Sequence, residues 1–405
     1  MRSWKLTTYA LMRCNQVHPT NRMSEVAEQS VIHKSPLEET HKRLGAVMMD
    51  AGEWRLAASY GDTAAEYGAV REGGAGLMDF SSRGRIEVRG SEAVQFLNGL
   101  ITNDVKALDE NAWMLAAFPN VQGRLIAEAR VLRLGSDRFL FDTESVCRER
   151  VLKTLERFTL AGDFHVTDLA DEMAHISVQG ASAAAILKAT LGEEAAHVKR
   201  GRIHTGQWNN QPLHVIRATH TSEDGFDLFV DTAEAVSLWD ALTIGGARAV
   251  GNDALDILRI EAGLARYGVD VDETNVVLEA VADDAVSFTK GCYIGQEIIA
   301  RIHWRGHVAK KLTGIVFDEQ GTPKRDDKVR TMDGKEIGRL TSVTFSPHSQ
   351  SMIALGYVKY DYLAPATVVR VATGDEELAA HVAELPHVRG SWYELSDGAA
   401  AEHQA

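Results

Sequence analysis

The stretch GRIEVRGSEAVQFLNGLITNDV, residues 84–105, sets the architecture predicted for this chain. Its first part alternates Ile86 and Val88 with charged residues, which is the pattern of a half-buried strand. Ser91 is a suitable N-cap for the helix that follows directly, and that helix runs out at the sequence TNDV. We therefore expect Asp104 in a loop just beyond a helix end, a position where binding and catalytic residues often lie.

The length and charge of the chain limit its function class. A chain of 405 residues is expected to form two or three domains, because single cores rarely exceed ~250–300 residues. Its formal charge of −14 disfavours binding to nucleic acid or to a membrane surface. No apolar run reaches the roughly 18 residues of a bilayer span. Its three cysteines, Cys14, Cys147 and Cys292, are widely spaced, which favours a reducing, cytoplasmic location.

The rest of the pattern predicts an α+β protein with a C-terminal β-barrel. Residues 36–77 are predicted to be mainly helical, and strands and helices interleave from there to residue 264 without a GxGxxG phosphate loop. Short strands separated by turn residues then predict a barrel or sandwich. The predicted regions are an N-terminal extension at 1–35, an α+β region at 36–310 with subdomains at roughly 36–160 and 161–310, a barrel at 311–392 and a flexible tail at 393–405.

The N-terminal extension begins with a basic, acid-free segment. Its apolar stretch, within residues 1–22, is too short and broken for a secretory signal. A transit peptide fits this composition, and so does a start codon placed upstream of a true start at Met23. We prefer the second interpretation, because nothing before Ser35 shows periodic structure.

The octet KGCYIGQE, residues 290–297, heads the most basic segment of an acidic chain. The charge of Lys290 would favour the thiolate of Cys292, so a reactive thiol and a buried structural cysteine both fit. The flanking Gly291 and Gly295 permit close backbone approach. The cations around the octet suit an anionic small molecule or a solvated strand face; they are Lys290, Arg301, Arg305, Lys310 and Lys311.

Three further features have simple structural interpretations. His303 and His307 stand four residues apart, but no carboxylate completes a ligand set there, and we predict no metal site. The stretch SEDGFDL, residues 222–228, fits a hairpin turn better than a ring-recognising acid pair. Arg259 and Glu261 can pair with neighbours on a predicted helix.

Several separated motifs, however, resemble a known family over most of the chain from about Leu37. LMDFSSRGRIEVRG, FLNGLITNDV, SEDGFDL and LRIEAG resemble the folate-binding family of the glycine-cleavage T-protein (aminomethyltransferase) and the YgfZ proteins of iron-sulfur cluster maintenance. KGCYIGQE, with the following AR and RGH, is similar to the YgfZ signature, whereas aminomethyltransferases typically lack the cysteine. The resemblance implies an α+β, aminomethyltransferase-like multi-domain fold around a central folate channel, with a C-terminal β-barrel.

The resemblance also implies roles for individual residues. Asp104 matches the T-protein acid that lies by the folate and serves aminomethyl transfer, and Glu223 matches the acid that pairs with the pterin. At the channel mouth, Lys290 and Cys292 would act as further catalytic residues. The residues implied to bind the cofactor tetrahydrofolate are Asp104, Glu223, Gly291, Tyr293 and Arg301.

The implied function is that of a tetrahydrofolate-binding accessory protein for assembly or repair of iron-sulfur clusters, including those of radical enzymes of tRNA modification. Its partners would be assembly proteins or cluster-bearing clients, met transiently, because one thiol cannot hold a cluster alone. Leu255 stands where T-proteins usually carry an arginine, which counts against glycine cleavage itself. The alternatives are a folate-dependent aminomethyl or other one-carbon transferase, and an interaction protein whose pocket is vestigial.

Overall fold

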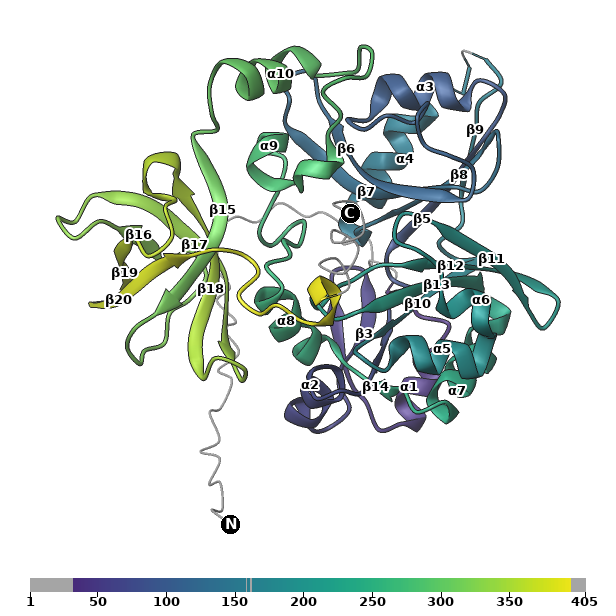
Figure 1. Ribbon diagram of the computed structural model, residues 1–405, viewed down its shortest axis with the longest axis horizontal. Coiled ribbons are helices and arrows are strands. Elements are labelled where there is room, and N and C mark those ends of the chain that lie inside the picture. Colours follow the sequence, from purple (N-terminus) through teal and green to yellow (C-terminus); the bar gives the residue numbers. More distant parts are fainter. Residues whose placement is uncertain (1–31, 158, 161, 395–405) are drawn as a thin grey trace, which may run out of the picture. The chain divides into compact units, whose positions relative to one another are not determined.

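A computed structural model describes residues 32–157, 159–160 and 162–394, and the statements below concern this part of the chain (Figure 1). The expectations for residues 1–22, and for all but the first two residues of the tail at 393–405, lie outside it. No described helix is long and apolar enough to cross a membrane.

The first α+β region is built on a five-stranded antiparallel sheet in the order β6-β7-β8-β5-β9. Ile86 and Val88 of β5 are fully buried, but Arg85 and Glu87 are buried as well, so the prediction of a half-buried strand is wrong. The strands are β5 (Gly84–Arg89), β6 (Ala112–Pro119), β7 (Leu125–Arg133), β8 (Arg138–Thr143) and β9 (His165–Asp168), and the helices are α3 (Ala93–Leu100) and α4 (Arg148–Glu156).

The predicted N-cap of α3 is wrong in detail. Glu92 occupies the N-cap position and its side chain makes no capping hydrogen bond. The hydroxyl of Ser91 donates instead to Asp163 Oδ2 at 2.7 Å, which ties the helix start to the segment before β9. The helix itself is held by burial of its apolar face, including Leu97 and Leu100.

The second α+β region contains a six-stranded sheet in the order β11-β12-β13-β10-β4-β14. Helices α5 and α7 pack their apolar faces against its buried residues. The strands are β4 (Gly76–Asp79), β10 (Met173–Gln179), β11 (Ile203–Trp208), β12 (Gln211–Arg217), β13 (Gly225–Asp231) and β14 (Arg248–Ala249), and the helices are α5 (Ala183–Leu191), α6 (Glu193–Ala196) and α7 (Ala235–Ile244).

The prediction that residues 36–77 are mainly helical is wrong. Between helices α1 (Glu38–Arg43) and α2 (Thr63–Arg71), the strands β2 (Val47–Ala51) and β3 (Trp54–Ser59) form an antiparallel hairpin, with β1 (His33–Lys34) beside β3. Gly52 turns this hairpin with φ +62°, a conformation that glycine adopts without steric cost.

The predicted C-terminal β-barrel is confirmed as a closed six-stranded barrel in the order β15-β18-β17-β16-β19-β20. Closure pairs the first strand with the last, so the barrel has no free edge. The strands are β15 (Lys310–Phe317), β16 (Lys328–Arg330), β17 (Glu336–Ser346), β18 (Ser351–Lys359), β19 (Val368–Thr373) and β20 (Glu376–Ala383).

Helix α8 (Asn252–Glu261) connects to the barrel through buried charges. Arg259 Nη1 donates to Asp270 Oδ2 at 2.8 Å, and its Nη2 donates to Ser342 Oγ of β17 at 2.8 Å. The side chains of Thr341 and Ser342 donate to Asp270 Oδ1, each at 2.6 Å. Arg259 therefore contacts a distant barrel strand as well as its helix neighbour Asp256.

We predict that Arg259→Met lowers the free energy of unfolding by about 3–5 kcal/mol, because it leaves Asp270 buried without its cation. Urea unfolding followed by circular dichroism measures the loss. Arg330→Met is the matched control, since its ion pair with Glu377 is exposed and contributes less than about 1 kcal/mol. Equally small losses of unfolding free energy in both variants would contradict a stabilising role for the buried ion pair between Arg259 and Asp270.

Candidate functional site

Asp104 lies in the loop that follows α3, as the sequence predicts, and is half-buried there. Its Oδ1 accepts hydrogen bonds from the backbone amides of Lys106 and Ala107, at 3.0 and 3.3 Å. The preceding Asn103 donates from its side chain to the carbonyls of Leu115 and Asp284, at 2.7 and 2.8 Å. The loop is thus fixed on both sides, and the carboxylate has a defined orientation.

The octet at residues 290–297 packs against this loop through a buried lysine. Lys290 is only 8% exposed, and its Nζ donates to the carbonyls of Ile101 and Asn103, at 2.9 and 2.6 Å. Burial lowers the pKa of Lys290 to about 8, although the nearby charge of Asp104 opposes the shift. Nζ also lies 5.1 Å from the centroid of the Tyr293 ring. Lys290 therefore holds the Asp104 loop in place.

The other residues of the octet differ sharply in exposure. Tyr293 is buried, which raises the pKa of its hydroxyl to about 12. Cys292 is a free, exposed cysteine, so the alternative of a buried structural cysteine is wrong for this residue.

Cys147 is buried in the core of the first region, and burial raises the pKa of its thiol to about 12.

The basic segment after the octet forms the helix α10 (Gln296–Arg305), which buries only Ile299. Arg301 points to solvent and donates to Glu297 at 2.6 Å. The strand-face interpretation is wrong for Arg301 and Arg305, which lie on this helix, whereas Lys310 and Lys311 begin the strand β15 and Lys311 is exposed there. His303 stacks on Phe288 with ring centroids 3.6 Å apart. The described residues contain no cluster of three or more side chains placed to hold a metal ion.

Glu223 lies in a second cluster, separate in its contacts from the Asp104 loop. Its Oε1 accepts from Arg71 Nη1 at 2.8 Å, and its Oε2 accepts from the amide and the hydroxyl of Ser391, at 2.9 and 2.6 Å. Arg71 Nη2 also donates to Glu261 Oε2 at 2.9 Å. Glu261 therefore pairs with a helix far away in sequence. Neither Arg71 nor Ser391 belongs to a motif that the sequence singles out.

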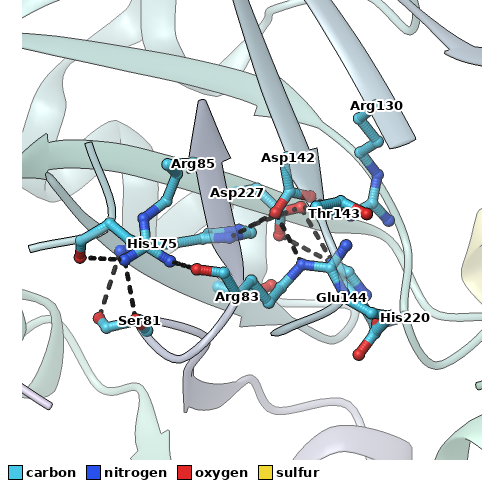
Figure 2. Close-up of polar contacts among 12 residues, drawn as sticks. Ser81, Arg83, Arg85, Arg130, Asp142, Thr143, Glu144, His175, His220 and Asp227 are labelled. Carbon is cyan, nitrogen blue, oxygen red and sulfur yellow. Dashed lines mark hydrogen bonds and ion pairs between the residues drawn. The ribbon is translucent and has the colours of Figure 1, made fainter. Parts of the chain in front are cut away.

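A third cluster of buried charges joins the two sheets, as Figure 2 shows. The ring of His175 on β10 lies between two carboxylates, with Nδ1 3.5 Å from Asp142 on β8 and Nε2 3.4 Å from Asp227 on β13. Arg83 Nε donates to Asp142 at 2.7 Å, and Arg130 Nη1 donates to it at 3.1 Å. Burial alone would raise the pKa of Asp142, but Arg83 and His175 outweigh burial and lower it.

His220 belongs to this third cluster, and Glu128 lies within the influence of the charges of Arg130 and Arg83; both have shifted pKa values. Burial lowers the pKa of His220 to about 4, against the opposing charge of Asp227, whose carboxylate lies 2.9 Å from the ring. Burial raises the pKa of Glu128 to about 7. The members come from separate strands and loops, so no short motif could have revealed the cluster.

Comparisons with known proteins agree over most of the chain. The GCVT N-terminal domain matches residues 37–290, and the glycine cleavage T-protein C-terminal barrel domain matches residues 310–388. An aminomethyltransferase from Xylella fastidiosa is 32% identical to this chain, over 89% of this chain and 97% of its own length. An aminomethyltransferase from Rubrobacter xylanophilus is 33% identical, over 82% of this chain and 88% of its own length. The crystal structure of glycine cleavage system aminomethyltransferase T from Bartonella henselae shares the fold, with a TM-score of 0.82 and 24% identity over 88% of this chain and 98% of that one.

The two glycines of the octet should respond differently to substitution. Gly295 has φ +77°, and a Cβ there would clash with the carbonyl of Asn120, whereas a Cβ on Gly291 meets no atom within 4 Å. We predict that Gly295→Ala costs about 1–3 kcal/mol of stability. Gly291→Ala, the matched control, should change it by less than about 0.5 kcal/mol. Urea unfolding measures both, and equal effects would contradict the tight turn.

The lowered pKa of Lys290 gives a pH-dependent prediction. Between about pH 8 and its ordinary value of about 10.4, the unfolded chain holds more protons at this group than the folded chain, so stability rises with pH. Relative to Lys290→Met, the wild-type free energy of unfolding should rise by about 2 kcal/mol across that interval. Urea unfolding at several pH values measures the difference. A difference that stays constant with pH would mean that Lys290 titrates normally.

Proposed function

Because this chain belongs to the glycine cleavage T-protein family, we propose that it is a tetrahydrofolate-dependent transferase of an aminomethyl or other one-carbon unit. The relatives that match it along most of their length are named aminomethyltransferases, which favours this alternative over the accessory role that the octet implies. The one-carbon donor stays open, because Leu255 stands where T-proteins usually carry an arginine.

The observation that carries the proposal is the fixed carboxylate of Asp104. Its Oδ1 is held by two backbone amides, while Oδ2 accepts no hydrogen bond from the described residues. A carboxylate held in this way can accept the proton of an amine and stabilise positive charge that develops beside it. Lys290 acts through the loop, since both of its hydrogen bonds go to backbone carbonyls next to Asp104. In this proposal Asp104 is the catalytic residue and Lys290 is a positioning residue.

Recognition of the folate is assigned to the second cluster. A carboxylate accepts hydrogen bonds from the amino and ring N–H donors of a pterin, and Glu223 is buried next to Arg71, a cation that it shares with Glu261. Gly291, Tyr293 and Arg301 remain predicted contacts of the cofactor. Of these three, Arg301 carries a positive charge that is exposed to solvent, and it suits the anionic glutamate tail of a folate.

One observation favours the accessory role as a second candidate. Cys292 is exposed on the loop that Lys290 fastens to Asp104, so its thiol is open to a partner protein. A shared, transient contact with an iron-sulfur assembly protein or a client enzyme would use such a thiol. The cytoplasmic location and the lack of direct nucleic-acid binding also remain predictions.

Turnover of tetrahydrofolate with an aminomethyl-lipoyl donor tests the transferase. We expect Asp104→Asn to lower kcat by about 10²- to 10⁴-fold, because the amide keeps the hydrogen bonds to Lys106 and Ala107 but cannot accept a proton. Cys292→Ala is the matched control and should retain turnover within about twofold.

The same pair of variants distinguishes the second candidate. Each variant is expressed in a strain that lacks the protein, and the activity of a cluster-dependent tRNA-modifying enzyme is measured. Rescue of that activity by Asp104→Asn but not by Cys292→Ala would favour the accessory role. Absence of turnover in the wild-type protein with every aminomethyl and one-carbon donor tried would refute the transferase.

A further inference from the structure

The last described segment of the chain, residues 385–394, runs from the barrel to the second α+β region, and we name it the strap. It leaves β20, and the amide of Val388 donates to the carbonyl of Glu261 on α8 at 3.0 Å. Farther along, the amide of Trp392 donates to the carbonyl of Ser222 at 3.1 Å. The strap thus ends on the loop that carries Glu223.

Ser391 of the strap occupies one side of the Glu223 carboxylate. Its amide and its hydroxyl both donate to Oε2, at 2.9 and 2.6 Å, and the hydroxyl accepts from the amide of Asp224 at 2.9 Å. The approach is so close that a Cβ on Gly390 would clash with the same carboxylate. An aminopyrimidine ring offers two adjacent N–H donors, one for each oxygen of a carboxylate, so Ser391 occupies an oxygen that such a ring would need.

The loop beneath the strap carries signs of a binding site. Ser222 has φ +66°, which is uncommon for a residue other than glycine, asparagine or aspartate, and such strain often marks ligand sites. Its hydroxyl is buried and has no hydrogen-bond partner among the described residues. A buried hydroxyl without a partner is costly, so a ligand that reached it would gain a hydrogen bond that the strap does not supply.

We propose that the strap is an internal plug of the Glu223 site, and that residues 390–394 must leave before a ligand with adjacent N–H donors can bind there. This inference rests on the proposed function, in which that ligand is a folate. Arg71 approaches Glu223 at the other oxygen, Oε1, and stays in place when the strap leaves. Release therefore exposes a carboxylate that is already paired with a cation and oriented.

The contacts of residues 390–394 suit reversible release. Val388 is the last fully buried hydrophobic residue of the described chain, and beyond it Trp392 and Tyr393 are only half-buried. Its other contacts include the guanidinium of Arg200, which lies 3.6 Å from the centroid of the Trp392 ring. Segments with few buried apolar contacts open at low free-energy cost. The anchor at Val388 would keep the released segment near the site.

Calorimetric titration with tetrahydrofolate, combined with amide exchange by mass spectrometry, tests the plug in the full chain and its variants. Removal of residues 390–405 deletes the plug, and removal of residues 395–405 alone is the matched control. Ser391→Pro removes both donors to Glu223 in a chain of full length. Glu223→Ala reports whether the ligand uses this carboxylate, and thermal unfolding verifies that each variant folds.

We expect the full chain and the 395–405 deletion to bind equally, and the 390–405 deletion and Ser391→Pro to bind about ten-fold more tightly. Amide exchange in residues 389–394 should accelerate when tetrahydrofolate is added. Weaker binding after deletion, or slower exchange, would overturn the plug and make the strap a wall of the site.

The remaining outcomes separate the inference from the proposed function. Unchanged affinity in Glu223→Ala would overturn the plug but leave a folate-dependent transferase intact, because the ligand would then bind elsewhere. Absence of binding in every variant, including the deleted chain, would overturn the folate function and the plug together.

Discussion

The guanidinium of Arg71 is the interaction on which the arrangement of the described chain depends. It is buried, and it binds Glu223 and Glu261 at once, so one cation is shared by two carboxylates from different elements. Ser346 at the end of β17 donates to Glu261 Oε1 at 2.6 Å, and the hydroxyl of Tyr67 donates to the same oxygen at 2.9 Å. Helix α2, helix α8, the loop before β13 and the barrel are thereby joined at one point. A buried ion set of this kind tolerates little displacement, since each charge would lose its partner.

The two parts of the candidate site, the Asp104 loop and the Glu223 cluster, are held by different kinds of interaction. The Asp104 half is made of loops fastened by hydrogen bonds to backbone carbonyls and amides, with Lys290 as the buried fastener. The Glu223 half is made of paired charges from distant segments. Both positions therefore depend on residues distant in sequence: Lys290 donates to Asn103 across 187 residues, and Arg71 donates to Glu223 across 152 residues. In the proposed transferase, the Asp104 loop would hold a reacting nitrogen and the Glu223 cluster would bind an extended ligand.

Local sequence patterns predicted much of the fold and the Asp104 loop, because alternation and helical spacing report burial within one element. The strand at Ile86 and Val88 and the barrel are examples. The hairpin at Gly52 was missed because a single glycine interrupts an apolar run that also fits a helix. The partners of Glu223 were missed because Arg71 lies 152 residues before it and Ser391 lies 168 residues after it. A pattern read over neighbouring residues cannot reveal contacts between residues so far apart in the sequence.

Closure of the barrel has a consequence for the evolution of the chain. Because β20 pairs with β15, with Ala383 opposite Gly314, the chain leaves the barrel beside the strand by which it entered. The turns between the other barrel strands can lengthen, shorten or acquire new surface features without moving that exit. Changes in the length of these turns therefore need not alter how Ser391 meets Glu223 in this chain.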